Sequence, residues 1–408
     1  MILKHNYRFY PTETQKVELA RTFGCVRFAY NFGLRLRTDS YKVGKPINFN
    51  ESSRLWTLRK REDGVEWLNE VSSVPLQQAL RNLQGAFVNF FEKRAKYPTF
   101  KKKQGKQSAT YTHSGFTFTK EKGNRVINIA KIGKIDIQWT RAFKSEPSTV
   151  TITKDRAERY FVSIVLDETP KPMAKTNEAI GIDLGINRLA TLSNGERIAN
   201  PRYTVFYAKR LARAQRVLAR RVKGSGRRNQ QRIKVACIQA KIGDARKDNL
   251  NKLTTNLVRR FDRICIEDLN VRGMVRNHCL AKSITDASFG AFRSILEAKA
   301  RMYGKQVWYA DRFFPSSKRC NQCGYIMQGM SLEVREWDCP ECKAHHDRDE
   351  NAAKNILKFA KYIEPKPQRK KAVGLIVSAR GGNVRPVKSL DLKGSSRRSV
   401  NNLEVVNA

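Results

Sequence analysis

The spacing of apolar residues divides the chain into stretches with a helical period and stretches with a two-residue period. Apolar positions recur every three to four residues at 17–36 and at 76–93, which predicts amphipathic helices there. Thr12 begins a capping box before the first of them, and another helix is expected at 51–62. We therefore expect residues 12–105 to form a helical domain whose aromatic residues pack into its core.

Alternation of apolar and polar residues replaces the helical period after this domain, as in the segment RYFVSIVLD. Such β-branched and aromatic runs favour strands, and residues 2–10 alternate in the same way. We expect residues 1–11 and 106–168 to form one antiparallel β-barrel or sandwich, with the helical domain inserted between its two pieces. The Pro- and Lys-containing residues 169–178 then form a linker.

Short apolar strands and helical stretches follow the linker. Strands are expected at the start of this second half, at 262–269 and at 305–310, and helices at 209–260 and 288–303. Residues 363–408 are rich in Gly, Ser and basic residues and have no period, so we expect a disordered basic tail there.

The chain is strongly basic. It has 80 Lys and Arg residues against 37 Asp and Glu, a net charge of +43, so a polyanion is the expected partner. Seventeen of the basic residues lie at 209–260, where only two residues are acidic. A solvated helix face would also look basic, but contact with a phosphate backbone explains this excess better. The candidate contacts are Arg210, Arg213, Arg220 and Arg221.

Four of the eight cysteines have the spacing C-x2-C-x15-C-x2-C; they are Cys320, Cys323, Cys339 and Cys342. This spacing is typical of a structural zinc site with four thiolate ligands, and two redox pairs are the alternative. The following His345 and His346 are expected at the rim of an active site or in solvent.

The expected location of the protein helps to decide between a zinc site and two redox pairs. The start of the sequence lacks a signal-peptide pattern, and no run approaches about 18 apolar residues. We therefore expect a reducing cytoplasmic location, where CxxC pairs more often bind metal than form disulfides.

Three acidic residues stand at the ends of predicted elements: Asp183 and Glu267 end strands, and Asp349 begins a helix. One carboxylate in such a place is usually a turn or capping residue. Three together fit a two-metal phosphodiesterase site, in which ions about 3.5–4 Å apart hold the attacking and leaving oxygens. Asp183 would bridge both ions, while Glu267 and Asp349 would each hold one. We prefer these acids to their neighbours Asp268 and Asp347.

The segment GIDLG at 181–185 has a second interpretation, because actin-like sugar kinases and ATPases also open with an Asp-x-Gly hairpin. Those proteins usually continue with a Thr or Ser that contacts phosphate, whereas Ile186, Asn187 and Arg188 follow here. A net charge of +43 also suits a nucleotide kinase poorly. The nuclease interpretation is therefore preferred.

Four segments together resemble the TnpB family of transposon-associated, RNA-guided DNA endonucleases, which are similar to compact type V CRISPR effectors. The segments are GIDLG (181–185), ICIEDLN (264–270), FPSSKRCNQCG (314–324) and CPECKAHHDRDENAAKNI (339–356). The position of the cysteine pairs between the second and third acidic residues also resembles that family.

The resemblance implies an α/β fold. A RuvC-type (RNase H-like) nuclease domain at 179–313 and 343–362 would contain an inserted zinc ribbon at 314–342. A β-barrel wedge domain carrying the helical recognition domain would precede it. Asp183, Glu267 and Asp349 match the family's catalytic acids, so two magnesium ions and one structural zinc ion are expected.

The resemblance also implies partners. The chain would act as a monomeric protein bound to a guide RNA from the transposon end, in the prokaryotic cytosol or nucleoid and without a membrane. It would cleave guide-matched double-stranded DNA next to a short motif, with Gln77 as a candidate DNA contact. Two alternatives remain open: a transposon-derived zinc-ribbon regulator that binds nucleic acid without cleaving it, and a DNA transposase.

Overall fold

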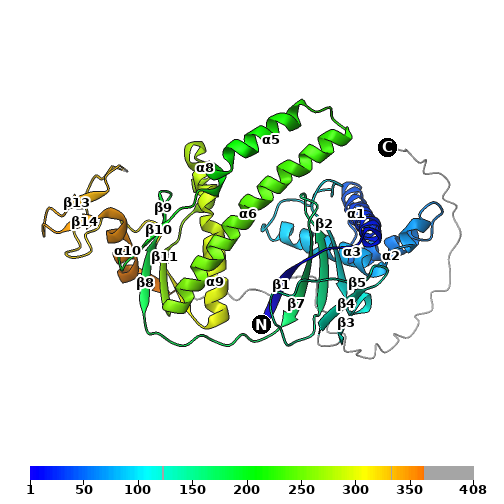
Figure 1. The fold of residues 1–408 in the computed structure, drawn as a ribbon, viewed down its shortest axis with the longest axis horizontal. Helices are drawn as coiled ribbons and strands as arrows, with labels where there is room; N and C mark the ends of the chain where they lie inside the picture. Colours follow the sequence, from blue (N-terminus) through cyan, green and yellow to red (C-terminus); the bar gives the residue numbers. More distant parts are fainter. Residues whose placement is uncertain (122–123, 332, 363–408) are drawn as a thin grey trace. The chain divides into compact units, whose positions relative to one another are not determined.

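The computed structural model describes residues 1–121, 124–331 and 333–362 (Figure 1). The predicted tail at 363–408 lies outside the described residues. The two largest groups of buried apolar side chains do not share residues. One extends from Tyr7 to Leu166, and the other from Ile180 to Tyr309. Each half of the chain is therefore built around a core of its own.

Helices follow the first strand. They are α1 (Glu13–Lys42), α2 (Phe49–Arg59), the 3-10 helix η1 (Glu66–Asn69) and α3 (Ser73–Phe91). α1 begins where the sequence predicted, because Thr12 Oγ1 accepts a hydrogen bond from the Gln15 N–H and Gln15 Oε1 accepts one from the Thr12 N–H. α1 and α3 pack closely at Gly33, where an added Cβ would lie 2.8 Å from Leu80 Cδ2.

The apolar face of α3 is buried over most of its length. Leu76, Leu80 and Leu83 are no more than 2% exposed, as the sequence predicted. The helical spacing of apolar residues extends the predicted inward face to Phe91, but this part of the prediction is wrong, since the Phe91 side chain is 70% exposed. Phe91 is the last residue of the helix, beyond the part that α1 covers with its own buried residues.

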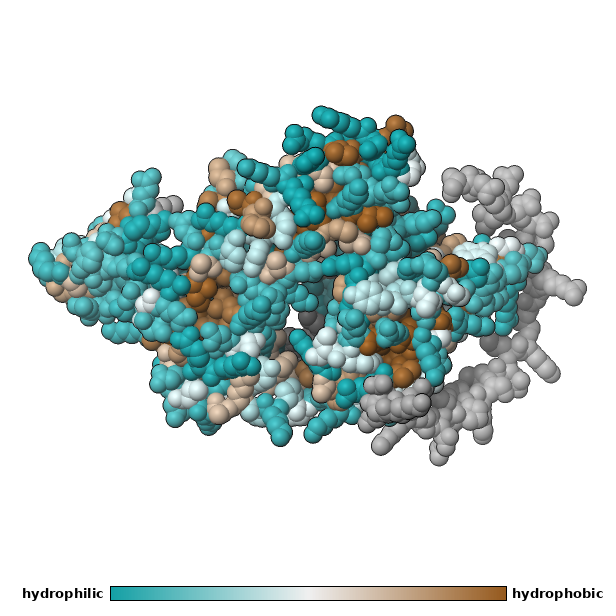
Figure 2. Space-filling model, viewed as in Figure 1, coloured by the Kyte–Doolittle hydropathy of each residue, from teal (hydrophilic) through white to brown (hydrophobic). Residues whose placement is uncertain are grey.

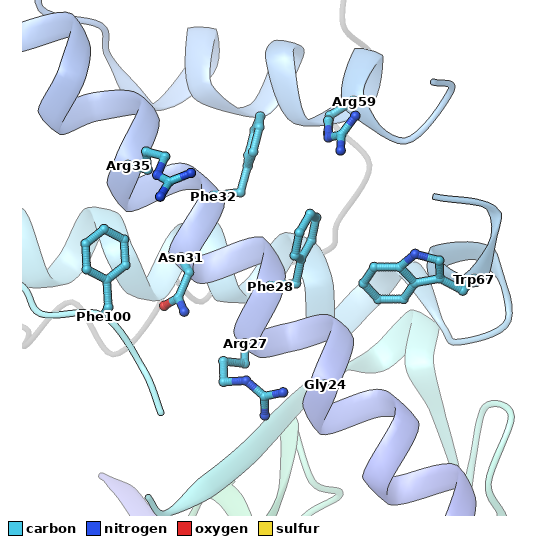
Figure 3. A pocket seen from close by; sticks show the side chains of 9 residues that line it. All are labelled: Gly24, Arg27, Phe28, Asn31, Phe32, Arg35, Arg59, Trp67 and Phe100. Carbon is cyan, nitrogen blue, oxygen red and sulfur yellow. The ribbon is translucent and has the colours of Figure 1, made fainter. Parts of the chain in front are cut away.

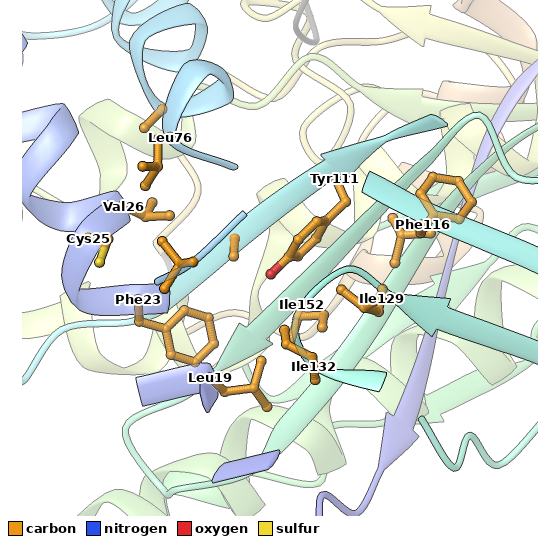
Figure 4. Close-up of a cluster of buried hydrophobic side chains, with 14 of the residues drawn as sticks. Leu19, Phe23, Cys25, Val26, Leu76, Tyr111, Phe116, Ile129, Ile132 and Ile152 are labelled. Atoms are coloured by element: carbon orange, nitrogen blue, oxygen red, sulfur yellow. The ribbon is translucent and has the colours of Figure 1, made fainter. Parts of the chain in front are cut away.

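The strands of the first half form two antiparallel sheets, with the orders β1-β7-β6-β2 and β3-β4-β5. They are β1 (Ile2–Phe9), β2 (Gln107–Thr112), β3 (Phe116–Glu121), β4 (Asn124–Ile129), β5 (Gly133–Ile135), β6 (Thr149–Lys154) and β7 (Tyr160–Asp167), with the 3-10 helix η2 (His113–Gly115) after β2. β1 pairs with β7 from Ile2 opposite Asp167 to Phe9 opposite Tyr160. The first strand therefore joins the later strands, as predicted. Side chains from both sheets, α1 and α3 share one core (Figure 4).

The second half contains a six-stranded mixed sheet with the order β10-β9-β8-β11-β12-β15. Its strands are β8 (Ala179–Asp183), β9 (Arg188–Leu192), β10 (Arg197–Ala199), β11 (Arg263–Glu267), β12 (Gln306–Ala310) and β15 (Lys361–Tyr362). β8, β11 and β12 run parallel, and the other three pair antiparallel to their neighbours. The parallel strands end at one edge of the sheet, where the predicted acidic residues stand.

Seven described helices accompany this sheet, and they include helices on both of its faces. They are α4 (Tyr203–Phe206), α5 (Ala208–Arg220), α6 (Gly226–Arg260), α7 (Val271–Met274), α8 (His278–Ala287), α9 (Phe289–Tyr303) and α10 (Arg348–Phe359). Successive side chains of a strand point to opposite faces. Ile180 and Ile182 of β8 share a core with Leu296 of α9, whereas Cys265 of β11 packs on the other face with Ile356 of α10.

α10 lies exceptionally close to β8. A Cβ added at Gly181 would lie 2.0 Å from the carbonyl oxygen of Ala353 and 2.7 Å from the backbone nitrogen of Leu357. Both obstacles are backbone atoms, so no side-chain rotation relieves them. Only a glycine permits this contact, and the small Ala352 and Ala353 are fully buried beside it.

We predict that Gly181→Ala destabilises the protein by at least about 3 kcal/mol, because the added methyl overpacks an interface that cannot yield. Thermal unfolding measures the change. Gly243→Ala is the matched control, since Gly243 is exposed in α6 with nothing within 4 Å of its added Cβ. That variant should be neutral or more stable by up to about 1 kcal/mol. Equal melting temperatures for the two variants would contradict the close packing.

Candidate functional site

Asp183 and Glu267 lie at the carboxyl ends of two neighbouring parallel strands. β8 and β11 are paired up to Ile182 and Ile266, the residues just before the two acids. Because side chains alternate along a strand, Asp183 lies on the same face as Gly181, and Glu267 follows the same rule on β11. Both carboxylates therefore belong to the face on which α10 packs.

Asp349 reaches this region from the first turn of α10. Asp347 is the N-cap of that helix, and its Oδ1 accepts hydrogen bonds from the backbone N–H groups of Asp349 and Glu350, each 3.0 Å long. The capping fixes the start of the helix. The helix dipole favours acidic side chains in that first turn, where the cap fixes the position of Asp349.

The three carboxylates influence one another. Burial raises the pKa of Asp183 to about 8, and the negative charges of Glu267 and Asp349 add to the rise, while Arg348 opposes it. Burial also raises the pKa of Glu267, which a hydrogen bond from Ser316 opposes. Ionising all three side chains together is unfavourable without a cation. The structure thus brings together the three acids that the sequence singled out.

This donor set fits a hard divalent cation, since magnesium prefers carboxylate oxygens and usually keeps several water ligands. The carboxylates are spaced more widely than the cysteines. Among the described residues, only the four thiols bring one ligand atom each within 4.8 Å of all the others. The wider spacing suits ions that also bind water and a phosphate oxygen.

The neighbouring acids have other partners. Asp268 pairs with Arg293 at 2.5 Å and with Arg312 at 2.7 Å. Asp347 caps α10 through one oxygen and pairs with Arg197 at 2.8 Å through the other. These contacts give both residues structural roles, which favours Glu267 and Asp349 as the residues that would hold an ion.

Three polar residues that the sequence analysis missed connect the acids to the cysteine segment. Ser316 Oγ donates a hydrogen bond to Glu267 Oε1 at 2.6 Å. Asn355 of α10, which is fully buried, donates to the carbonyl of Ser316 at 2.9 Å. One turn earlier, Asn351 donates to the carbonyl of Arg319 at 2.8 Å. Two asparagines four residues apart on the buried face of one helix were the available signal.

The four predicted cysteines converge. The Sγ atoms of Cys320 and Cys342 are 3.6 Å apart, and those of Cys323 and Cys339 are 3.5 Å apart. A tetrahedral site with Zn–S bonds of about 2.3 Å has edges of about 3.8 Å. Burial opposes ionisation of Cys320, but backbone N–H groups of Cys323 and Gln322 lower its pKa below the usual range. The cluster is therefore compatible with zinc bound by thiolates.

The two histidines after the last cysteine differ in their surroundings. Both belong to β14 (His345–Asp347), which pairs with β13 (Glu336–Asp338). His345 is exposed and lies 2.8 Å from Asp338. The expectation of a rim or solvent position is wrong for His346, which is 5% exposed. Its Nε2 lies 3.1 Å from Cys320 Sγ and its ring packs on Trp337, so it belongs to the small core around the cysteines.

The candidate nucleic-acid contacts lie on the surface. Hydrophilic residues cover most of the face in Figure 2, in accord with a mean hydropathy of −0.58. No described carboxylate pairs with the exposed arginines that the sequence singled out at α5, which are Arg210, Arg213, Arg220 and Arg221. Gln77 is exposed and lines a cavity of about 300 Å³ with Lys60 and Arg61. Contact with nucleic acid at these residues remains a prediction.

Three protein-family models match parts of this chain. The family described as "Probable transposase" matches residues 163–278, the "Cas12f1-like, TNB domain" matches 289–356, and a "Helix-turn-helix domain" matches 1–46. In the structure, residues 1–46 form one strand and one long helix. Among the described residues, no helix combines the length and apolar character of a membrane span.

Two relatives share the name "Putative RNA-guided DNA endonuclease". The protein of Streptomyces pristinaespiralis is 46% identical over 96% of this chain and 94% of its own length, and that of Escherichia coli K12 is 30% identical over 86% and 90%. The Cas12f1 chain of a cryo-EM complex with sgRNA and target DNA has a TM-score of 0.56 over 85% of this chain and 83% of its own, at 14% identity. That likeness shows a shared mixed α/β fold.

The matched families define a transposon-associated class of protein. Within that class, the chain belongs to the TnpB family, in which the two relatives above carry the name "Putative RNA-guided DNA endonuclease".

The crowding of carboxylates predicts a pH-dependent stability difference between the protein and Asp183→Asn in magnesium-free buffer. The folded state keeps the Asp183 proton up to about pH 8, whereas the unfolded chain loses it near pH 4. Stability therefore falls as pH rises through this window, by up to about 1.4 kcal/mol per unit. Asparagine lacks this loss, so its melting-temperature advantage should grow between about pH 5.5 and pH 8. A constant difference would refute the raised pKa.

Removal of one buried thiol should abolish zinc binding. We expect one zinc ion per chain by elemental analysis, and none in Cys339→Ser, because three thiolates and water hold zinc less tightly than four thiolates. Hydrogen exchange should then rise in peptides covering 316–346, since structural zinc supplies folding energy. Cys279→Ser, at an exposed cysteine outside the cluster, should keep its zinc. Full zinc content in Cys339→Ser would rule out this ligand set.

Proposed function

We propose that this protein is an RNA-guided, magnesium-dependent DNA endonuclease that cleaves guide-matched DNA next to a short target-adjacent motif. The names of its relatives support the activity, and the Cas12f1 neighbour was solved with both an RNA and a target DNA. The convergence of Asp183, Glu267 and Asp349 at one sheet edge is the observation that carries the proposal.

The domain roles follow from this proposal. The mixed sheet with its helices would be a RuvC-type, RNase H-like nuclease domain at 179–313 and 343–362, interrupted by the zinc ribbon at 314–342. The strands at 1–11 and 106–168 would form the β-barrel wedge, and 12–105 the recognition domain. The linker would be 169–178. An isolated β-bridge between Phe9 and Ile137 supports a closed arrangement of the wedge strands.

The catalytic step would depend on two magnesium ions, which would activate a water molecule and stabilise the leaving oxygen of the phosphodiester. Asp183, Glu267 and Asp349 would together hold these ions. Ser316 orients Glu267 through its hydrogen bond. The first turn of α10 fixes Asp349, so the chain supplies a preorganised set of oxygen donors.

The basic surfaces would hold the nucleic acids. A protein that binds a guide RNA and an RNA–DNA heteroduplex through their backbones leaves sequence recognition to base pairing. The arginines of α5 suit that task because they are exposed along the helix. We propose that the chain works as a single copy with one guide RNA in a bacterial cytosol.

Asp183→Asn tests the proposal in a cleavage assay with the co-purified RNA and a matching DNA. The variant should cut at least about 10³-fold more slowly, as when one member of a cooperating catalytic set is removed. It should bind the RNA unchanged, since the exposed arginines at α5 stay in place.

Asp268→Asn is the matched control, because Asp268 adjoins Glu267 yet pairs with two arginines. It should lose no more than about 10- to 100-fold in cleavage rate, the loss typical of a supporting residue. Undiminished cutting by Asp183→Asn would refute the assignment. Target binding without cleavage by the unmodified protein would favour a regulator, and joined donor DNA ends would favour a transposase.

A further inference from the structure

A second candidate binding site lies in the helical part of the chain, separate from the acidic residues. A cavity of about 660 Å³ opens between α1, α2, η1 and the connector that follows α3 (Figure 3). Its volume is in the range of small-molecule and cofactor sites. Four aromatic residues and three arginines contribute to its lining, and no acidic residue does.

Aromatic rings form the walls. Phe28 and Phe32 lie one turn apart on α1, and the buried Trp56 packs behind both, with ring centroids 6.1 and 5.6 Å away. Trp67 of η1 meets Phe28 edge to face at 5.3 Å. Trp67 and Phe100 nevertheless remain 39% and 52% exposed. Trp56 already covers the core beneath Phe28 and Phe32. The rings of Trp67 and Phe100 therefore leave aromatic surface exposed that core packing does not need.

The cavity is preformed rather than a gap between mobile segments. Asn31 of α1 makes two hydrogen bonds with the backbone of Lys101. Its Oδ1 accepts one from the Lys101 N–H at 2.8 Å, and its Nδ2 donates one to the Lys101 carbonyl oxygen at 3.1 Å. The Lys101 ammonium lies 4.0 Å from the ring centre of Tyr30. These contacts hold Phe100 opposite α1.

The three arginines that line the cavity differ in whether another side chain already pairs with them. Arg59 pairs with Glu62, and Arg27 contacts the side-chain oxygen of Gln107 at 3.4 Å. Arg35 is exposed, and no described side chain forms an ion pair or hydrogen bond with its guanidinium. A cavity with aromatic walls and an unpaired guanidinium at its mouth suits a planar aromatic ligand that carries a negative charge.

An unpaired nucleotide has this chemistry, because its base stacks on aromatic rings and its phosphate pairs with arginine. Bases inside a duplex cannot enter such a cavity, whereas the loops and bulges of folded RNA present splayed bases that proteins hold on aromatic and arginine planes. We propose that this cavity binds one unpaired nucleotide of the guide RNA, its base against the aromatic side chains of Phe28, Trp67 and Phe100 and its phosphate on Arg35. This inference rests on the proposed RNA-guided function.

Crosslinking tests the occupant. The protein is expressed with its native flanking DNA in cells fed 4-thiouridine, irradiated, and digested, and crosslinked peptides and nucleotides are identified by mass spectrometry. We expect a crosslink from one RNA position to the peptide containing Phe28 or Trp67. Crosslinks confined to other regions would overturn the proposal. Photoreactive target DNA in a parallel sample should leave these peptides unlabelled, and labelling by DNA alone would overturn an RNA occupant.

Two variants test the energetics with the same co-purified RNA. Trp67→Ala should weaken RNA binding by about 5- to 150-fold, the loss expected for one stacked base. Arg35→Gln should reduce the slope of log K against log salt by about one, as for one lost phosphate contact. Because Arg35 is exposed, this second variant keeps the test valid if Trp67→Ala folds poorly.

Matched controls separate the cavity from general surface effects. Tyr41→Ala removes an aromatic ring of α1 that is 74% exposed outside the cavity, and Arg54→Gln removes an α2 arginine paired with Glu51. Both should bind RNA as the unmodified protein does. If RNA binds and guides cleavage but Trp67→Ala and Arg35→Gln behave like these controls, the cavity proposal fails alone. If no RNA co-purifies, the proposed function fails.

Discussion

The close contact between α10 and the backbone of β8 is the constraint on which the acidic site depends. Because Gly181 has no side chain, Ala353 approaches the strand so closely that even a Cβ would be 2.0 Å from its carbonyl oxygen. The helix carries Asp349 in its first turn and two buried asparagines further on. A larger residue at 181 would push the whole helix outward, so the third acid and the cysteine segment would both move away from Asp183.

The close approach of three acidic side chains at the sheet edge makes their ionisation unfavourable in the absence of a cation. Burial beside two other acids raises the pKa of Asp183 to about 8, which means that the metal-free fold tolerates a carboxyl that it cannot readily ionise. The apolar contacts beneath compensate, since Ile180, Ile182, Ile264 and Ile266 are almost fully buried. Functional sites commonly retain such strained groups because the surrounding structure over-determines their position. A bound cation would relieve the repulsion, so ion binding and folding stability are linked at this site.

The parts of this structure that the sequence predicted are those set by local rules. The Thr12 capping box, the four-cysteine spacing and the strand-end positions of Asp183 and Glu267 each depend on a few neighbouring residues. The contacts of Ser316 and Asn355 could not be predicted in this way, because they join segments 39 or more residues apart. The errors at Phe91 and His346 have the same origin: periodicity and spacing give the direction of a side chain, and only tertiary packing decides whether another element covers it.

The distribution of ion pairs explains how a strongly basic protein keeps Asp183 and Glu267 without a basic ion-pair partner among the described residues, while Asp349 has only a long pair with Arg335 at 3.9 Å. Near the site, arginines neutralise the carboxylates that would otherwise compete: Arg293 and Arg312 hold Asp268, and Arg197 holds Asp347. At α5, by contrast, the singled-out arginines have no described carboxylate partner. Arginines at the sheet edge are thus paired with carboxylates, whereas those at α5 stay free for the proposed contact with a phosphate backbone. An acidic centre repels a polyanion, so the proposed function would require both unpaired cations at a distance and divalent ions at the centre to bring a phosphodiester to Asp183.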